Sequence, residues 1–124
     1  MPVDRQPSLR TQAMPADTNP TSDIFGGWLM SQMDIAGAIY AHHMARGRVA
    51  TVGVKAMSFH SPVRVGDEVS CFCETDRIGN TSITVHIETW VRRRVTWVEE
   101  KVTEGLFTFV ALDESGKPRA VPKD

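Results

Sequence analysis

The stretch Trp28–Ala41 reads WLMSQMDIAGAIYA and contains a single charged residue, Asp34. A helix that is apolar on every side is a buried helix. A carboxylate in such a helix is costly unless it is paired, protonated or used in chemistry. Gly26 and Gly27 come directly before this stretch. We therefore expect a long buried helix that begins near two glycines and carries a functional aspartate.

The composition is that of an ordinary globular domain. Charged residues make up 23% and hydrophobic residues 41% of the 124 residues, which is typical of one soluble domain. The formal net charge of -1 gives no basic field that would attract nucleic acid. No segment has the pattern of a signal peptide or a membrane span. We expect one cytoplasmic domain over residues 1–124, with loose tails at 1–8 and 114–124, and neither nucleic acid nor membrane as a partner.

The cysteines and histidines do not form a recognisable metal or redox motif. Cys71 and Cys73 are two residues apart, which places both on one face of a strand rather than in a CxxC motif. His60 and His86 occur singly in strand contexts, and the HExxH pattern is absent. We interpret the cysteines as reduced, small apolar residues and expect neither a metal nor a cofactor.

Strand and turn signals follow the apolar stretch. Gly47 is a good C-terminal stop for the helix, and Gly105 suggests a bend or bulge in the last strand. Short connections between strands predict a mostly antiparallel sheet. We expect a strand at 9–14, a loop at 15–23, a helix from an N-cap at Ser22 or Asp23 to about Arg46, and strands at 49–59, 69–77, 81–91 and 96–112.

One sheet can cover only part of a helix that is apolar all round. The rest of the helix must therefore contact another subunit or a ligand, so a dimer is a physical expectation. Met30, Asp34, Gly37 and Ala41 share one face of the predicted helix. The small residues on that face predict close approach of a partner helix or an acyl chain.

Four runs of sequence resemble the hotdog-fold acyl-CoA thioesterases, in particular the bacterial YciA group. They are NPTSDIFGGWLMSQMD, SFHSPVRVGD, GNTSITVHIETWV and EGLFTFVALD, and the resemblance covers roughly residues 9–122. It implies an α+β hotdog fold, in which a curved antiparallel sheet of about five strands wraps a long central helix. It also implies a homodimer with a continuous sheet, assembled further as a trimer of dimers. The family usually carries a glycine where this chain has Ser22.

Thioester hydrolysis requires a polarised carbonyl and an activated nucleophile. Backbone amides at a helix start lack intrahelical partners and lie at the positive end of the dipole, so Gly26 is a candidate oxyanion donor, and Gly27 permits close approach of substrate. One such donor is typically worth ~3 kcal/mol. Asp34 is a candidate general base or a nucleophile that forms an anhydride. The resemblance implies that Asn19, seven residues before Gly26, orients the water or the carbonyl.

The spacing of these residues argues for a site shared between subunits. Gly27 and Asp34 are seven residues apart, or about 10 Å along a helix at roughly 1.5 Å per residue. Groups that act on one carbonyl should approach the reacting atoms to ~3 Å. We therefore predict a homodimer in which the glycine end of one subunit faces Asp34 of its partner.

Contacts to CoA or to the catalytic water are predicted in three places. Arg92, followed by Arg93 and Arg94, is a candidate for the phosphates because guanidinium binds phosphate bidentately; the alternative is a solvated strand end. Thr51, early in its strand, is a candidate hydrogen-bond partner of the catalytic water. The resemblance also implies contacts to pantetheine or nucleotide from a turn and strand start, namely Gly79, Asn80, Thr81 and Ser82.

The sequence thus predicts an acyl-CoA thioesterase that releases a free carboxylic acid and CoA, with acyl-CoA as its substrate and no metal. A non-catalytic acyl-CoA binding or sensing module on the same fold is the alternative from another class. A hotdog dehydratase is a second rival, but it would need a histidine–carboxylate pair that this chain lacks at the equivalent positions. The non-catalytic alternative for Asp34 is that its carboxylate caps the backbone of another subunit. No GxSxG motif supports a serine hydrolase.

Overall fold

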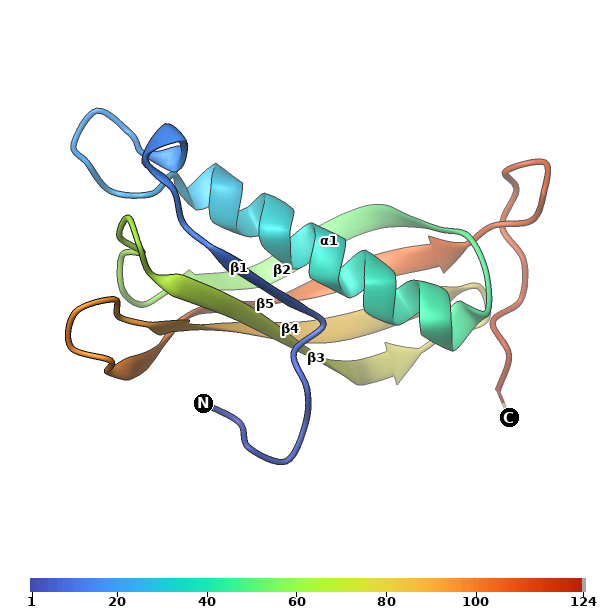
Figure 1. Cartoon of the computed structure of the whole chain (residues 1–124). Coiled ribbons are helices and arrows are strands. Elements are labelled where there is room, and N and C mark those ends of the chain that lie inside the picture. The colour runs from blue at the N-terminus through green and yellow to red at the C-terminus, as the bar shows by residue number, and fades with distance from the viewer. Residues whose placement is uncertain (124) are drawn as a thin grey trace.

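A long helix lies against a five-stranded antiparallel sheet in the computed structural model, which describes residues 1–123 (Figure 1). The α+β hotdog architecture is therefore confirmed. The sheet has the order β1-β3-β4-β5-β2, so that β1 and β2 form its two edges. The elements are β1 (Leu9–Gln12), a 3₁₀ turn η1 (Pro15–Asp17), α1 (Gly26–Ala45), β2 (Val49–Phe59), β3 (Glu68–Ile78), β4 (Ser82–Arg92) and β5 (Glu99–Ala111).

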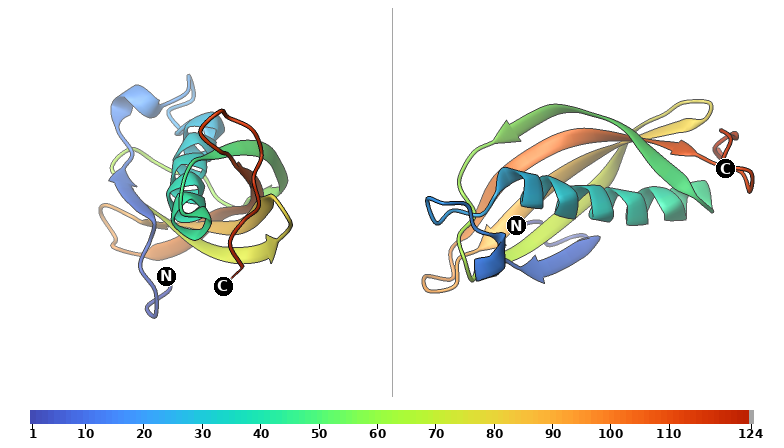
Figure 2. Two further views of the ribbon diagram at one scale, coloured as in Figure 1. Left: turned by 90° about the vertical axis from the view of Figure 1, so that its right-hand side faces the viewer. Right: turned by 90° about the horizontal axis from the view of Figure 1, so that it is seen from above.

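The alternation of buried and less buried side chains along the strands explains how the sheet packs against the helix. Every second residue of β4 is buried, as the sequence pattern predicted, because successive side chains of a strand point to opposite faces. The buried set faces α1, and the sheet curves around the helix when seen from above (Figure 2). Its members are Ile83, Val85, Ile87, Thr89 and Val91.

The sheet carries irregularities on both sides of Gly105. On β2, Ala56 and Met57 together lie opposite Gly105, between the pairs Lys55↔Leu106 and Ser58↔Glu104. Ala56 has a positive φ of 54°, which is uncommon for a residue with a side chain. A Cβ on Gly105 would collide with the Met57 sulfur. The predicted irregularity near Gly105 thus has two parts. One is this bulge on the edge strand β2, and the other is in β5 itself, where Val102 is the extra residue between the pairs Thr89↔Thr103 and Trp90↔Lys101.

The helix packs its small residues onto its own sheet. A Cβ on Gly37 would lie 2.7 Å from both Ile87 Cδ1 and Phe109 Cζ, so only glycine fits there without movement. Ala41 on the same face is also fully buried. The expectation that this face would receive a partner helix or an acyl chain was wrong at Gly37, because the sheet of the same chain occupies that space.

The first turn of α1 has no side-chain cap. The helix begins at Gly26 with Phe25 as N-cap, so the expectation of a cap at Ser22 or Asp23 was wrong. Ser22 instead occupies a turn with φ 70°. At the other end, Arg46 is left-handed and Gly47 N donates to His42 O at 3.2 Å, which confirms the predicted stop.

One side of the helix and one edge of the sheet are left uncovered. Ile35 and Ile39 on α1 are 48% and 52% exposed, and Val52 on the edge strand β2 is 61% exposed. Within residues 1–123, β2 pairs only with β5. Exposed apolar side chains beside an unpaired edge mark a surface suited to association.

The terminal segments lack helices but are packed against the sheet. Arg5 pairs with Glu88 at 2.8 Å and lies over the Phe72 ring at 5.5 Å from its centroid. Val121 is buried near the other end of the chain. The expected loose tails at 1–8 and 114–123 therefore make specific contacts, while Asp124 lies outside the described residues. No helix within residues 1–123 has the length and hydrophobicity needed to cross a membrane.

We expect Gly37→Leu to destabilise the protein by about 1–3 kcal/mol, because overpacking a dense core costs this much and Ile87 and Phe109 already fill the space. Urea unfolding at fixed protein concentration measures the effect. Gly27→Leu is the control, since a Cβ on Gly27 meets no atom within 4 Å. Equal stability of the two variants would contradict the packing at Gly37.

Candidate active site

Asp34 is bonded to the first part of β2. It is half-buried, and its Oδ1 accepts a 2.6 Å hydrogen bond from Thr51 Oγ1. This hydroxyl is the carboxylate's only hydrogen-bond partner among the described residues. An ionised carboxylate has about four acceptor positions, so Asp34 keeps capacity to bind a water molecule or a substrate group. Thr51 and Asp34 are thus brought together as a pair.

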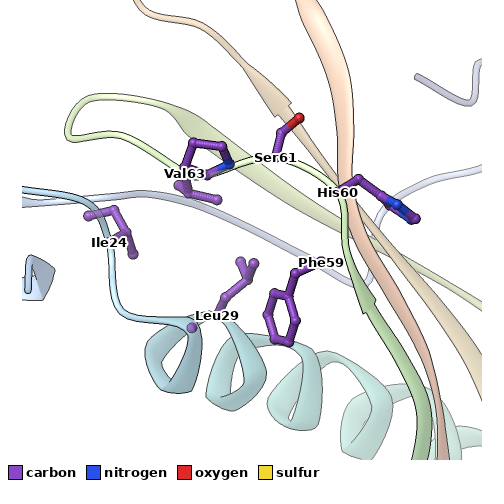
Figure 3. A pocket seen from close by; sticks show the side chains of 8 residues that line it. Ile24, Leu29, Phe59, His60, Ser61 and Val63 are labelled. Carbon is purple, nitrogen blue, oxygen red and sulfur yellow. The ribbon is translucent and has the colours of Figure 1, made fainter.

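The glycine end of α1 opens into a hollow. Gly26 and Gly27 are exposed, and the amides of a first helical turn lack intrahelical acceptors. The hollow beside them has a volume of about 310 Å³. Figure 3 shows the side chains of Ile24, Leu29 and Phe59 pointing toward one another inside it. A helix tip with free amides therefore adjoins an apolar space.

Phe59 is the side chain nearest to the helix tip. A Cβ on Gly26 would lie 3.6 Å from Phe59 Cε1, in ordinary contact. His60 and Ser61 follow Phe59 in the chain and line the same hollow, but their side chains point away from it (Figure 3). The end of β2 thus forms one wall of the space next to the candidate oxyanion donor.

Asn19 is held by its own loop. Its Oδ1 accepts hydrogen bonds from Thr21 N at 3.0 Å, Thr21 Oγ1 at 2.8 Å and Asp23 N at 3.1 Å. Its backbone N donates to Asp23 O at 2.7 Å. The side-chain oxygen is therefore occupied, and Nδ2 is the group that remains to act on a ligand. Ser22, where the family usually has glycine, takes the left-handed conformation at the tip of this loop.

A single chain does not bring Gly26 and Asp34 together. The hollow at the glycine end is lined by residues 24, 26, 29 and 59–63, and not by Asp34 or Thr51. Eight residues of helix separate Gly26 from Asp34, which is about 12 Å at roughly 1.5 Å per residue. Within one subunit, the residues that the sequence predicts to be catalytic therefore lie in two separate places.

The predicted CoA contacts lie at opposite ends of β4. Gly79–Ser82 form the turn before this strand, where Val121 N donates to Asn80 O at 2.9 Å. Arg92 ends the strand, about 30 Å away at roughly 3.3 Å per residue. Its two terminal nitrogens donate to Glu68 at 2.9 Å and Glu99 at 3.0 Å. A phosphate would have to compete with these two carboxylates for Arg92.

Sequence reasoning missed a cluster centred on Glu104. His60 Nε2 and His86 Nε2 each lie 3.1 Å from a Glu104 oxygen, and Lys101 Nζ lies at 3.2 Å. Hydrogen bonds from His60, His86 and Lys101 lower the pKa of Glu104 to about 2. The alternation of side chains in β4 and β5 is a signal that could have placed His86 and Glu104 on the outer face of the sheet. The position of His60 could not be predicted in this way, because the bulge in β2 breaks the alternation. Within residues 1–123, no group of side chains is arranged to hold a metal ion.

The two cysteines are buried on the face of β3 that packs into the core. Both are free thiols. Burial raises the pKa of Cys71 to about 12 and that of Cys73 to about 11. Because the thiolate is the nucleophilic form, neither cysteine is a nucleophile at neutral pH.

Fold and geometry together define a hotdog protein that carries a helix tip with free amides and, separately, a Thr-bonded carboxylate. The model of the thioesterase superfamily matches residues 22–98. The chain is 55% identical over 117 residues to the acyl-CoA thioester hydrolase YciA of Escherichia coli, covering 92% of this chain and 89% of that protein. The chain belongs to the thioesterase superfamily.

Two solved structures extend the comparison. HI0827, described as a hexameric broad-specificity acyl-coenzyme A thioesterase and solved as an aspartate-to-alanine mutant, is 45% identical with a TM-score of 0.91, covering 95% of this chain and 87% of that one. The Staphylococcus aureus acyl-CoA hydrolase, solved with butyryl-CoA and CoA, is 31% identical with a TM-score of 0.85, covering 92% and 70%. Its asparagine-to-alanine and threonine-to-alanine mutants were solved as well.

We expect Glu104→Gln to remove part of the acid sensitivity of the fold. The Glu104 pKa is lowered from 4.5 to about 2, so its charged form stabilises the native state above pH 4.5, and this contribution is lost as the pH falls toward 2. The stability difference between wild type and Glu104→Gln should therefore shrink over that range, as measured by chemical unfolding at several pH values. A difference independent of pH would contradict the assignment.

Proposed function

We propose that this protein is an acyl-CoA thioester hydrolase that converts acyl-CoA to a free carboxylic acid and CoA. The observation that carries the proposal is the Thr51–Asp34 hydrogen bond, which holds a half-buried carboxylate beside the edge strand. The names of the relatives agree with this activity. The base and the electrophilic groups come from the protein, and CoA is part of the substrate.

The mutants made in relatives support the choice of residues. The asparagine and threonine altered in the S. aureus hydrolase are 32 residues apart, which is the separation of Asn19 and Thr51 in this chain. An aspartate was altered in HI0827. The three residue types are those of the Asn19, Asp34 and Thr51 constellation proposed here.

We propose that two half-sites meet across a dimer formed by the β2 edges. Pairing of two β2 strands about a twofold axis at Val54, the middle of the strand, would place Thr51 opposite the partner's Met57 and Val49 opposite the partner's Phe59. Phe59 lies against Gly26 in each subunit. The Asp34–Thr51 pair of one subunit would therefore adjoin the glycine tip of the other, and the exposed face of α1 would be covered.

In this site the thioester oxygen would accept hydrogen bonds from the Gly26 amide, with Gly27 permitting its close approach. One carboxylate oxygen of Asp34 is occupied by Thr51, so the other would accept a proton from water. The hydroxide attacks the thioester carbon, the C–S bond breaks, and the thiolate of CoA receives the proton from Asp34. Asn19 would act as a donor through Nδ2. If Asp34 itself attacked the thioester carbon, CoA thiolate would leave and a mixed anhydride would form. Attack of ¹⁸O-labelled water on the Asp34 carbonyl of this anhydride would leave ¹⁸O in the carboxylate after a single turnover, which the general-base route does not.

The higher assembly is proposed by analogy with the relatives. HI0827 is described as hexameric, and we propose a trimer of dimers for this chain. After β2 and α1 are paired, the hairpin between β4 and β5 still presents Val95, Trp97 and Val98 at its tip, all of them exposed. This tip is available for a contact between dimers.

We expect Asp34→Ala to lower kcat at least a hundredfold (about 2.7 kcal/mol or more of transition-state stabilisation) with little change in the melting temperature. A thiol-release assay with a panel of acyl-CoA substrates measures the rate. Asp76→Ala, which removes an exposed carboxylate of β3, is the matched control and should retain activity. A wild-type rate in Asp34→Ala would refute the mechanism, and tight acyl-CoA binding without turnover in the wild type would identify a sensing module.

Mixing two inactive variants tests the shared site. In a heterodimer of Asp34→Ala and Asn19→Ala subunits, one site receives both intact residues if they come from different chains. Random reassociation should then restore about a quarter of the wild-type activity, since half of the dimers are mixed and each has one intact site. Activity that stays at the level of the separate variants would show that Asn19 and Asp34 act within one chain.

A further inference from the structure

We propose that His60 is a positioning residue of the proposed active site. From the outer face of the sheet, its hydrogen bond to Glu104 holds Phe59 against the glycine tip of α1, and the position of Phe59 in turn helps to set which acyl groups are hydrolysed. This inference rests on the proposed function and concerns a side chain that does not itself touch the substrate. We call the His60–Glu104 contact the outer clamp.

The end of β2 that carries Phe59 has few backbone contacts to hold it in place. After its bulge, β2 resumes pairing with β5 for only two residues, with Ser58 opposite Glu104 and Phe59 opposite Thr103. Within residues 1–123, β5 is the only strand beside β2, because β2 is an edge of the sheet. Side-chain contacts therefore contribute more to the position of this strand end than they would in the middle of a sheet.

His60 is attached to β5 through both its backbone and its side chain. Its backbone N donates to Val102 O at 2.7 Å, and its Nε2 lies 3.1 Å from Glu104 Oε2. The pKa of Glu104 is lowered to about 2 by its hydrogen bonds, first of all the one from His60. Glu104 is thus a carboxylate that can only accept, so His60 Nε2 is the donor. Such a charge-assisted hydrogen bond is stronger than one between neutral groups.

Phe59 is the side chain whose position the outer clamp fixes. Successive side chains of a strand point to opposite faces, and Figure 3 shows the His60 imidazole directed away from the hollow and the Phe59 ring directed into it. A Cβ on Gly26 would lie 3.6 Å from Phe59 Cε1, yet Phe59 is 54% exposed. Because the ring is packed on one side only, its position depends on the backbone that carries it.

The proposed dimer gives the position of Phe59 a consequence for the substrate. Phe59 would lie between the Gly26 amide of its own chain and the Asp34–Thr51 pair of the partner, and it would form a wall beside the acyl group. A long acyl chain that enters the hollow of about 310 Å³ would run along this wall, whereas an acetyl group is too short to do so. Displacing the wall should therefore slow the hydrolysis of long acyl groups more than that of acetyl.

The chain contains a matched control for the outer clamp. His86 Nε2 also lies 3.1 Å from a Glu104 oxygen, but His86 belongs to β4, and none of the described residues that line the hollow comes from that strand. His60→Ala and His86→Ala each remove one histidine from the same carboxylate. Only His60→Ala loosens the strand end that carries Phe59, so a general effect on stability is separated from an effect on the site.

Comparing acyl groups tests the proposal. We expect His60→Ala to lower the ratio of kcat/KM for hexanoyl-CoA to kcat/KM for acetyl-CoA about tenfold, the effect of losing apolar contact over roughly two methylene groups. Any loss of folded protein cancels from this ratio, because one preparation is assayed with both substrates. His60→Gln keeps an amide donor for Glu104 and should restore most of the ratio. His86→Ala should leave the ratio unchanged.

A double-mutant cycle shows whether His60 acts through Phe59. Phe59→Ala removes the wall, so adding His60→Ala to it should change the ratio no further. A further change of the ratio in the double variant would overturn the proposal, as would an unchanged ratio in His60→Ala or an equal change in His86→Ala.

Spectra of protein labelled with ¹⁵N-glycine provide a readout independent of catalysis. Since the Phe59 ring lies against Gly26, its displacement should shift the Gly26 amide resonance in His60→Ala and not in His86→Ala. An unshifted Gly26 resonance in His60→Ala would contradict the outer clamp. If Gly26 shifts as expected but the wild type hydrolyses no acyl-CoA, the proposed hydrolase activity fails and the positioning contact stands.

Discussion

The helix α1 carries apolar side chains around its circumference, whereas a single five-stranded sheet covers only one side of it. The covered side is packed so tightly that a Cβ on Gly37 would collide with Ile87 and Phe109. The uncovered side presents Ile35 and Ile39 next to the open edge of β2. Burying this surface is favourable at roughly 25 cal/mol per Å². The composition of the helix therefore favours association of subunits, and the proposed site lies beside this exposed surface.

The same constraint separates the two kinds of charge that the proposed chemistry needs. The free amides at the tip of α1 carry partial positive charge, and Asp34 lies two turns further along the same axis. Within one chain they cannot act on one carbonyl. In the proposed dimer, an antiparallel β2–β2 contact would bring the tip of one helix to the middle of the other. Pairing of the edge strands would then assemble the proposed site and bury the apolar face in one step.

Local periodicity was sufficient to predict the fold. The site was harder to predict, because it is formed by contacts between segments that are distant in the sequence. The alternation of β4 and the apolar run of α1 are local patterns, and both agree with the structure. The face of α1 that holds Gly37 was expected to receive a partner helix or an acyl chain, because periodicity shows which residues share a face but not what packs against it. The helix start was misplaced because its cap is Phe25, a residue without a capping side chain.

The ion pairs of the charged side chains could not be predicted from the sequence. Arg92 resembles a phosphate ligand in the run RRR, yet its partners Glu68 and Glu99 lie on neighbouring strands and became visible only with the register. The same register joins His60 and His86 through Glu104, three residues that are far apart in the chain.

The loop that precedes the helix contains a strained residue, Ser22, next to the proposed site residue Asn19. Ser22 adopts a positive φ of 70°, a conformation that costs a residue with a side chain about 1–2 kcal/mol relative to the right-handed region. The turn that requires it directs three donors onto Asn19 Oδ1. With its oxygen occupied, Asn19 is restricted to donating through Nδ2. In the proposed site, a fixed donor near the helix tip would stabilise the oxyanion without reorganisation during the reaction. The strained turn would then determine which end of the asparagine amide is available to the substrate.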